Sequence, residues 1–308
     1  MLSKPTTFVI GAGASVPYGF PDGRTLYQQA IALTPDTEPY IVLRQHMGSD
    51  AEHLPRLLDE LRRDEGASVD GYLATRADDH RVQQFGRALI VLLVGTYHLK
   101  QRATGFGAGV AIEEDWLSGV LATMCSGTTL DRFSADNSNT RFVTFNFDLL
   151  IEQACRHVFG RAFVPSLKFG QENQHVDPLI KALDVIHVHG HFRLFEGLHP
   201  FWIPRAVDEL RIVSDRPEDK VLMHSQAAIR QADVICFLGF GFHPDNLRKL
   251  GLAARLQDGR PCTLYASGVG MNQDQRSQVS RQVRHAIAFG DANESCRRFL
   301  ERVGLIRA

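Results

Sequence analysis

Short runs dominated by apolar residues recur along the chain and predict buried strands. The runs are Phe8–Ile10, Phe142–Phe145, Val185–Val188, Val234–Leu238 and Cys262–Tyr265. A strand covered on both faces is apolar almost throughout, whereas a half-exposed strand alternates between apolar and polar residues. Helical spacing follows several runs, as over Leu149–Val158 and Leu247–Leu256. Strands that alternate with helices predict a Rossmann-like α/β fold, which is a doubly wound parallel sheet.

The stretch over about residues 25–126 has a different pattern. It is rich in Leu, Arg, Asp, Gln and Ala at helical spacing and contains no convincing strand. This pattern predicts a helical insertion, or cap subdomain, between the first strand and the rest of the sheet. The polar run Ser134–Thr140 predicts a loop before the next strand. We therefore expect one domain over residues 1–308 that carries a helical cap.

Composition and charge narrow the class of protein. The chain is 44% hydrophobic and 22% charged, with a net charge of −1, which excludes a largely disordered chain. The balanced charge also argues against a protein that binds nucleic acid by general phosphate neutralisation. The apolar run Ala88–Val94 has seven residues, far fewer than the roughly 20 that span a membrane. The start of the chain has no signal-peptide pattern, so we expect a cytoplasmic protein without membrane contact.

Cysteine spacing bears on redox state and on metal binding. The five cysteines are scattered and form no CxxC pair. Their spacing excludes a zinc ribbon and argues against a disulfide framework. An odd number of dispersed thiols fits a reducing compartment.

Two glycine-rich segments directly follow predicted strands. Gly11–Ser15 (Gly-Ala-Gly-Ala-Ser) comes after the first strand, and Gly239 and Gly241 come after Val234–Leu238, before a helix expected near Pro244. Glycines let a backbone approach a phosphate, ribose or base closely. The first segment lacks the third glycine of GxGxxG, so the usual dehydrogenase pattern is not met. Both segments are also compatible with plain turns between a strand and a helix.

Polar residues follow the strand Phe142–Phe145. Asn146 and Asp148 stand where this strand ends, and ligands of open α/β sheets bind outside the carboxyl ends of strands. Their amide and carboxylate groups suit sugar hydroxyls. The alternative for Asp148 is that it caps the next helix.

Histidines alternate at the end of another strand. The alternation of side chains along a strand predicts that His187, His189 and His191 lie on the same side of the strand. Gly190 would end the strand and leave room for a ligand. An imidazole with a pKa of about 6.5 is a natural proton acceptor, and the strand-end position favours His189. Two alternatives remain. The histidines could bind a metal ion, although no carboxylate or cysteine lies at ligand spacing, or they could be a chance cluster.

The order of these motifs resembles the sirtuin-like NAD-consuming domains. The closer resemblance is to the bacterial silent-information-regulator-like NADases of antiphage defence. In the wider family the glycine loop leads into Gly-x-Pro-Asp-x-Arg, and Gly19–Arg24 (Gly-Phe-Pro-Asp-Gly-Arg) stands at that place. The resemblance covers residues 8 to about 290 in outline and is specific only at the motifs.

The resemblance implies that NAD is the substrate and that no metal is needed. The residues expected at the pyrophosphate are Gly11, Ala12, Gly13 and Ser15. Those expected at the nicotinamide side are Asp22 and Arg24. The residues implied for catalysis are Asn146 and Asp148, which would bind the ribose and orient the attacking group, and His189 as general base. Those expected along the adenosine part are Gly239, Gly241 and Phe242.

Two departures from the family bear on the reaction. Protein-deacylating sirtuins carry a zinc ribbon of four cysteines, which the spacing in this chain excludes, and Gly23 replaces their aromatic residue near the nicotinamide. Both argue against deacylation. The resemblance then implies an NAD+ glycohydrolase that releases nicotinamide and ADP-ribose as an antiphage effector. Oligomerisation, or a partner such as a HerA-type ATPase or an Argonaute-like protein, would activate it. The alternative is a module that senses NAD or ADP-ribose without turnover.

Overall fold

The computed structural model describes residues 2–64, 68–165, 173–192 and 198–307. Six strands in this part of the chain form one sheet in the order β3-β2-β1-β4-β5-β6. Their bounds are Thr6–Ile10 (β1), Thr140–Thr144 (β2), Ile186–His187 (β3), Val234–Leu238 (β4), Thr263–Ala266 (β5) and Ile287–Phe289 (β6). All neighbouring pairs are parallel. The Rossmann-like parallel fold predicted from the sequence is therefore confirmed.

β1 lies in the middle of the sheet because it pairs with both β2 and β4. Phe8 aligns with Phe142 on one side and with Cys236 on the other. The chain winds outward through β2 and β3, then returns to the far side of β1 through β4, β5 and β6. The winding direction therefore reverses between β1 and β4, and the loops that follow these two strands lie side by side.

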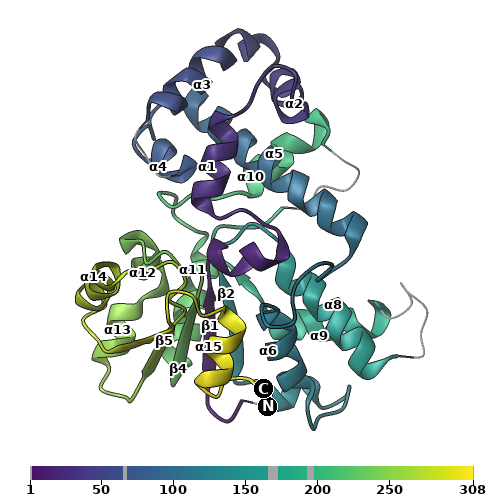
Figure 1. Ribbon diagram of the computed structural model, residues 1–308, viewed down its shortest axis with the longest axis vertical. Helices are drawn as coiled ribbons and strands as arrows, with labels where there is room; N and C mark the ends of the chain where they lie inside the picture. Colours follow the sequence, from purple (N-terminus) through teal and green to yellow (C-terminus); the bar gives the residue numbers. More distant parts are fainter. Residues whose placement is uncertain (1, 65–67, 166–172, 193–197, 308) are drawn as a thin grey trace.

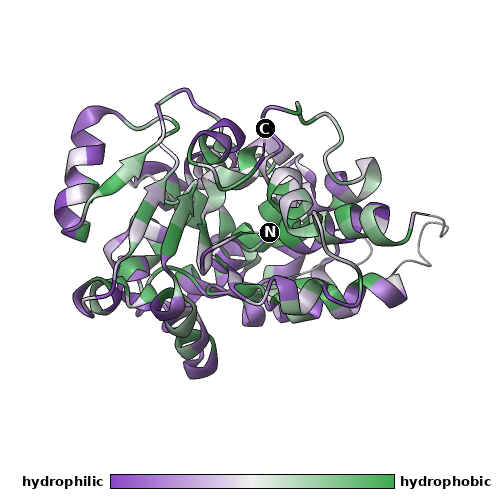
Figure 2. Cartoon of the chain, turned by 90° about the horizontal axis from the view of Figure 1, so that it is seen from below, coloured by the Kyte–Doolittle hydropathy of each residue, from purple (hydrophilic) through white to green (hydrophobic). Residues whose placement is uncertain are grey.

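Helices cover both faces of the sheet. The helices on the face that buries Phe8 and Phe142 are α6 (Trp116–Cys125), α8 (Leu150–Phe163), α9 (Asn173–Leu183) and α15 (Cys296–Arg302). Those on the face that buries Val9 and Phe237 are α11 (Asp219–Gln231), α12 (Pro244–Leu250), α13 (Leu252–Gln257) and α14 (Gln273–Val283). Figure 2 shows the strands as mainly hydrophobic and the helices as polar on their outer sides. The apolar strand runs follow from this coverage.

A second group of helices packs around a core of its own, and we call it the helical cap. Its members are α1 (Gly23–Ile31), α2 (Glu38–Met47), α3 (Leu54–Arg63), α4 (Val69–Ala74), α5 (His80–Thr104) and α10 (Ile203–Glu209). Figure 1 shows the cap above the carboxyl ends of the central strands. The described residues also form three 3-10 helices, namely Ala12–Tyr18, Gly48–His53 and Pro200–Trp202. No helix in the described ranges is long and apolar enough to cross a membrane.

The region over about residues 25–126, which the sequence predicts as one insertion, packs in two separate places. α1 to α5 belong to the cap, but α6 packs against α8 and α15 beside the sheet. α10 joins the cap from a later part of the chain, where it contacts α5. The cap core therefore combines two separate segments of the sequence.

Several local predictions need correction. The expected loop over Ser134–Thr140 overlaps the short helix α7 (Phe133–Asp136). The expected helix over Leu247–Leu256 is two helices, because Gly251 between them has a left-handed backbone with φ of +64°. β3 is shorter than Val185–Val188, and β6 was not predicted.

Candidate functional site

The glycine loops after β1 and β4 pack directly against each other. The backbone N–H of Gly13 donates to the carbonyl oxygen of Gly239 over 3.1 Å. A Cβ on Gly11 would lie 2.5 Å from that oxygen, and one on Gly239, where φ is +55°, would lie 1.9 Å from the nitrogen of Ala14. Glycine is therefore required here by loop packing alone. Gly241 differs, because a Cβ added there would have no heavy atom within 4 Å.

A buried hydrogen-bond network joins the loop after β1 to the loop after β2. The Asn146 amide nitrogen donates to Ser15 Oγ over 3.0 Å, and Ser15 Oγ donates to Asp148 Oδ2 over 2.9 Å. Asp148 Oδ1 also accepts from the backbone N–H of Leu150, the first residue of α8. Asp148 thus satisfies the start of a helix, as its alternative sequence interpretation predicts, and it also completes the network. Burial raises the pKa of Asp148, and the Ser15 and Leu150 hydrogen bonds oppose the rise.

α6 holds the glycine loop from the other side. Trp116 Nε1 donates to the carbonyl of Ala14 over 2.8 Å, and Tyr18 donates to Asp115 Oδ1 over 2.8 Å. Tyr18 also accepts from the backbone N–H of Leu117. The sequence motifs gave no signal for these contacts, because the partners lie about a hundred residues apart along the chain.

His189 is buried beside aromatic rings and a lysine. Its side chain meets Phe145 edge-on with ring centres 5.1 Å apart, and Nε2 lies 3.3 Å from Lys249 Nζ on α12. Burial lowers the pKa of His189 to about 3, and the Lys249 charge acts in the same direction. The neighbouring Asn246 side chain and the Phe145 carbonyl act the other way. Sequence reasoning did not identify Lys249.

His187 has a partner of opposite charge. Its Nε2 lies 2.8 Å from Glu152 Oε1, and its Nδ1 lies 3.4 Å from the Asn146 carbonyl oxygen. Burial by itself lowers the pKa of His187, but the Glu152 carboxylate, together with Asp148 and the Asn146 carbonyl, outweighs burial and raises it overall. Burial acts to raise the pKa of Glu152, and His187 outweighs it, so that pKa is lowered.

The prediction that three histidines share one side is wrong. His187 and His191 lie together with ring centres 4.7 Å apart, whereas His189 contacts Phe145 and Phe147. β3 ends at His187, and Gly190 has a φ of +74°. The strict alternation of a strand therefore stops before His189.

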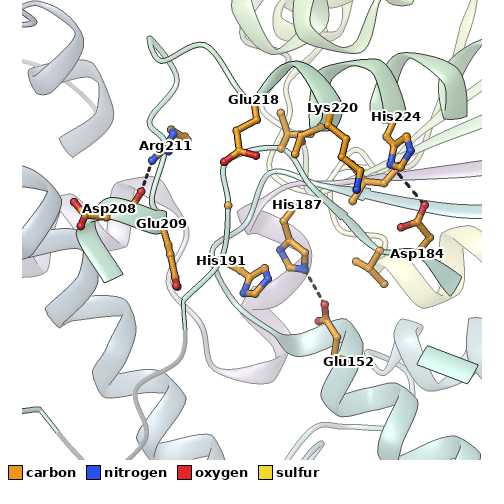
Figure 3. Close-up of a pocket in the computed structure, with 15 residues that line it drawn as sticks. Glu152, Asp184, His187, His191, Asp208, Glu209, Arg211, Glu218, Lys220 and His224 are labelled. Carbon is orange, nitrogen blue, oxygen red and sulfur yellow. Dashed lines mark hydrogen bonds and ion pairs between the residues drawn. The ribbon is translucent and has the colours of Figure 1, made fainter. Parts of the chain in front are cut away.

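His187 and His191 line a cavity of about 610 Å³ along β3 (Figure 3). Its other charged or titratable lining residues are Glu152, Asp184, Asp208, Glu209, Arg211, Glu218, Lys220 and His224. These side chains come from α8, the segment around β3, α10, the segment between α10 and α11, and the first half of α11. No sequence pattern indicates this cavity, because its walls come from separate parts of the chain.

The remaining sequence candidates lie in different settings. Asp22 caps α1 by accepting from the backbone N–H of Thr25, and Arg24 is exposed in the first turn of that helix. Phe242 is buried in the sheet core against Phe237, with ring centres 5.0 Å apart. Among the described residues, no group of three His, Cys, Asp or Glu side chains has an arrangement that could hold a metal ion.

Comparison with known proteins gives distant likenesses to solved structures. No family model and no curated protein matches this chain. A crystal structure of SIR2 in complex with the inhibitor EX-527, 2'-O-acetyl-ADP-ribose and a deacetylated p53 peptide is 11% identical, covers 97% of this chain and 93% of its own, and has a TM-score of 0.40. Sir2Tm bound to a propionylated peptide is 12% identical with the same coverage and a TM-score of 0.41. Likenesses this distant leave the chemistry to be argued from the site's own residues.

Proposed function

We propose that the protein is an NAD+ glycohydrolase that releases nicotinamide and ADP-ribose. The observation that carries the proposal is the strand order β3-β2-β1-β4-β5-β6, which places both glycine loops where the winding reverses. In sheets of this order, dinucleotides bind in the crevice at the reversal, outside the carboxyl ends of the strands. The buried network of Ser15, Asn146 and Asp148 borders the same point.

The residues around the reversal fit the parts of a dinucleotide. We assign the pyrophosphate to the backbone of Gly11–Gly13 and to Ser15. Gly241 has the open space above it that a close approach of the adenosine part requires. The Phe242 ring lies in the core, so only its backbone is assigned to that part. Asp22 and Arg24 begin the first cap helix, on the side assigned to nicotinamide.

The side chains suit cleavage of the bond between nicotinamide and ribose. As the C–N bond breaks, positive charge develops on the ribose, and the Asp148 carboxylate and the Asn146 amide stabilise this charge and fix the ribose hydroxyls. Nicotinamide leaves as a neutral molecule and needs little acid assistance. Water then forms the new C–O bond, and His189 accepts its proton, directly or through a ribose hydroxyl. Positioning of these groups supplies part of the rate enhancement.

The biological setting is proposed from the motif resemblance alone. On that ground the protein is a cytoplasmic effector that depletes NAD+ during antiphage defence. Its activation is assigned to homo-oligomer formation or to a partner, of which a HerA-type ATPase or an Argonaute-like protein are the candidates. Light scattering coupled to size-exclusion chromatography tests the oligomer, and an always-active monomer would contradict it.

The activity is tested by incubating the purified protein with NAD+ and following nicotinamide and ADP-ribose by chromatography. Release is expected from the parent protein and is expected to fall strongly in Asn146→Ala and His189→Ala. The matched controls are Asn293→Ala and His80→Ala, at exposed positions of the same residue types. If both site variants cleave NAD+ at the parent rate, the assignment of the site is wrong.

One observation favours a second function, a module that binds NAD or ADP-ribose without turnover. The Nε2 atom of His189, which would accept the proton, already lies beside Lys249 Nζ. If Lys249 always occupies the His189 nitrogen, the protein could bind NAD+ but could not cleave it. Calorimetric binding of NAD+ without any nicotinamide release would support this alternative.

A further inference from the structure

Lys249 is held firmly beside His189 by carbonyl groups. Its Nζ donates to the carbonyl oxygen of Val213 over 2.7 Å and lies 3.5 Å from that of Ile212, in addition to its 3.3 Å contact with His189 Nε2. An ammonium group can only donate hydrogen bonds. Nε2 of His189 must therefore be the acceptor, and its lone pair is used by Lys249.

The hydrogen of the neutral imidazole then resides on Nδ1. This assignment follows from the partners rather than from an observed hydrogen. In this arrangement the ring has no nitrogen ready to take a proton from water or from a ribose hydroxyl. His189 can act as a base only when Lys249 moves away or loses its own proton.

The helical cap contacts the segment between α10 and α11, and the carbonyl groups of that segment bind Lys249. Arg87 on α5 binds both carboxylate oxygens of Asp215, over 2.8 and 2.9 Å, and also the carbonyl of Leu210. Asp215 Oδ2 in turn accepts from the backbone N–H of Ile212 over 2.8 Å. Contacts therefore run without interruption from α5, through the segment between α10 and α11, to Lys249.

We propose that Lys249 is a positioning residue that restrains His189, and that the cap sets the strength of this restraint through Arg87 and Asp215. The proposal rests on the proposed function, which gives His189 its role as a base. It deepens that function by placing the control of the reaction within the chain itself. A movement of α5 that carries Asp215 with it would withdraw Lys249 from the imidazole.

Charges around the contact support the restraint. Burial lowers the pKa of Lys249 to about 8, against the opposing charges of Asp215 and Asp70. Burial raises the pKa of Asp70 on α4 to about 6, and its Oδ1 has no hydrogen-bond partner in the described part of the chain. The charged or titratable groups that interact with the pair are Asp70, Asp215, His243 and Arg248. Arg87 and Arg211 act on the pair indirectly, through Asp215.

The restraint predicts how the reaction depends on pH. A lysine with a pKa of about 8 is neutral in roughly a tenth of the molecules at about pH 7 and in most of them at about pH 9. We therefore expect NAD+ cleavage by the parent protein to rise about tenfold over this range. In Lys249→Met the rate at pH 7 should already be about tenfold higher and should change little with pH.

A titration without substrate tests the contact directly. The histidine resonances of the whole protein are followed by NMR against pH, and that of His189 is assigned by its loss in His189→Gln. In Lys249→Met and Lys249→Gln we expect His189 to titrate at least about one unit higher than in the parent. Lys181→Met, which removes an exposed lysine on α9, should leave it unchanged. Lys249→Gln can still donate to the Val213 carbonyl and serves if the methionine variant does not fold.

The outcomes separate the two proposals. An unchanged His189 titration in both Lys249 variants overturns the restraint, whatever the activity. A shifted titration with slower NAD+ cleavage also overturns it, because Lys249 would then assist the reaction. A shifted titration with faster cleavage supports it. A shifted titration without cleavage by any variant supports the contact and removes the proposed function.

Discussion

His187 and His189 are separated by one residue, yet they lie in surroundings of opposite charge. His187 faces Glu152 on the cavity side of β3, and its pKa is raised. His189 faces Lys249 among aromatic rings, and its pKa is lowered to about 3. Both side chains are almost fully buried. Burial lowers the pKa of both imidazoles, whereas the nearest charge opposes burial at His187 and adds to it at His189, so the nearest charge accounts for the difference between the two.

The largest expected difference between the two histidines is in activity. If His189 is the base, His189→Gln should lower NAD+ cleavage by about 100-fold or more. His187→Gln should cost less than about tenfold, because His187 contacts only the backbone carbonyl of Asn146 among the proposed site residues. Initial rates are measured well below the melting temperature of each variant. A greater loss for His187→Gln would reverse the assignment.

The buried pair of His187 and Glu152 should contribute more to the free energy of unfolding than an exposed pair in the same cavity. Glu152→Gln removes the carboxylate from a contact whose side chains are 6% and 15% exposed, and we expect a loss of about 3 kcal/mol in the free energy of unfolding. The matched control in the same cavity is Asp184→Asn. Its partner His224 is 3.9 Å away and the two side chains are 50% and 60% exposed, so a loss below about 0.5 kcal/mol is expected. Urea denaturation measures both, and equal losses would contradict the comparison.

How much of this arrangement the sequence reveals depends on the distance between partners along the chain. The apolar runs of β1, β2, β4 and β5 were found because burial on both faces leaves a local pattern. β6 was missed because it has three residues and none is buried. The prediction for β3 is wrong because it continues the alternation of side chains past the end of the strand, which places His189 on the same side as His187.

Sequence patterns single out residues that the structure brings together, but they do not contain the contacts between them. Ser15 and Asp148 were both named, although nothing local shows that they meet across 133 positions. Lys249 was not named, because a lysine on an amphipathic helix usually faces water. Glu152 was missed for a similar reason, since its pairing with His187 spans 35 positions. Charges that set a protonation state come from the tertiary fold, and motif spacing does not contain them.

The two histidines should also give opposite slopes of stability against pH. The pKa of His187 is raised in the folded state, so its contribution is complete below about 6.5 and is lost as pH rises through the higher folded value. The pKa of His189 is lowered, so its contribution is present above about 6.5 and is lost as pH falls below that value. Denaturation of the parent, His187→Gln and His189→Gln between pH 5 and pH 8 gives each contribution as a difference. Parallel slopes would show that the two environments are not distinct.

The smallest expected effect concerns the ion pair that links the cap to the His189 side. Arg87 and Asp215 form two hydrogen bonds, with side chains 16% and 23% exposed, so Arg87→Met should cost about 1–2 kcal/mol of stability. Arg56 and Glu60 form a comparable pair on α3, but Arg56 is 81% exposed, so Arg56→Met should cost less than about 0.5 kcal/mol. Because Arg87 also fixes Asp215 near Lys249, its loss should raise the His189 titration slightly, whereas the loss of Arg56 should not. Denaturation and NMR of both variants measure this, and an equal response would show that the cap does not act on His189.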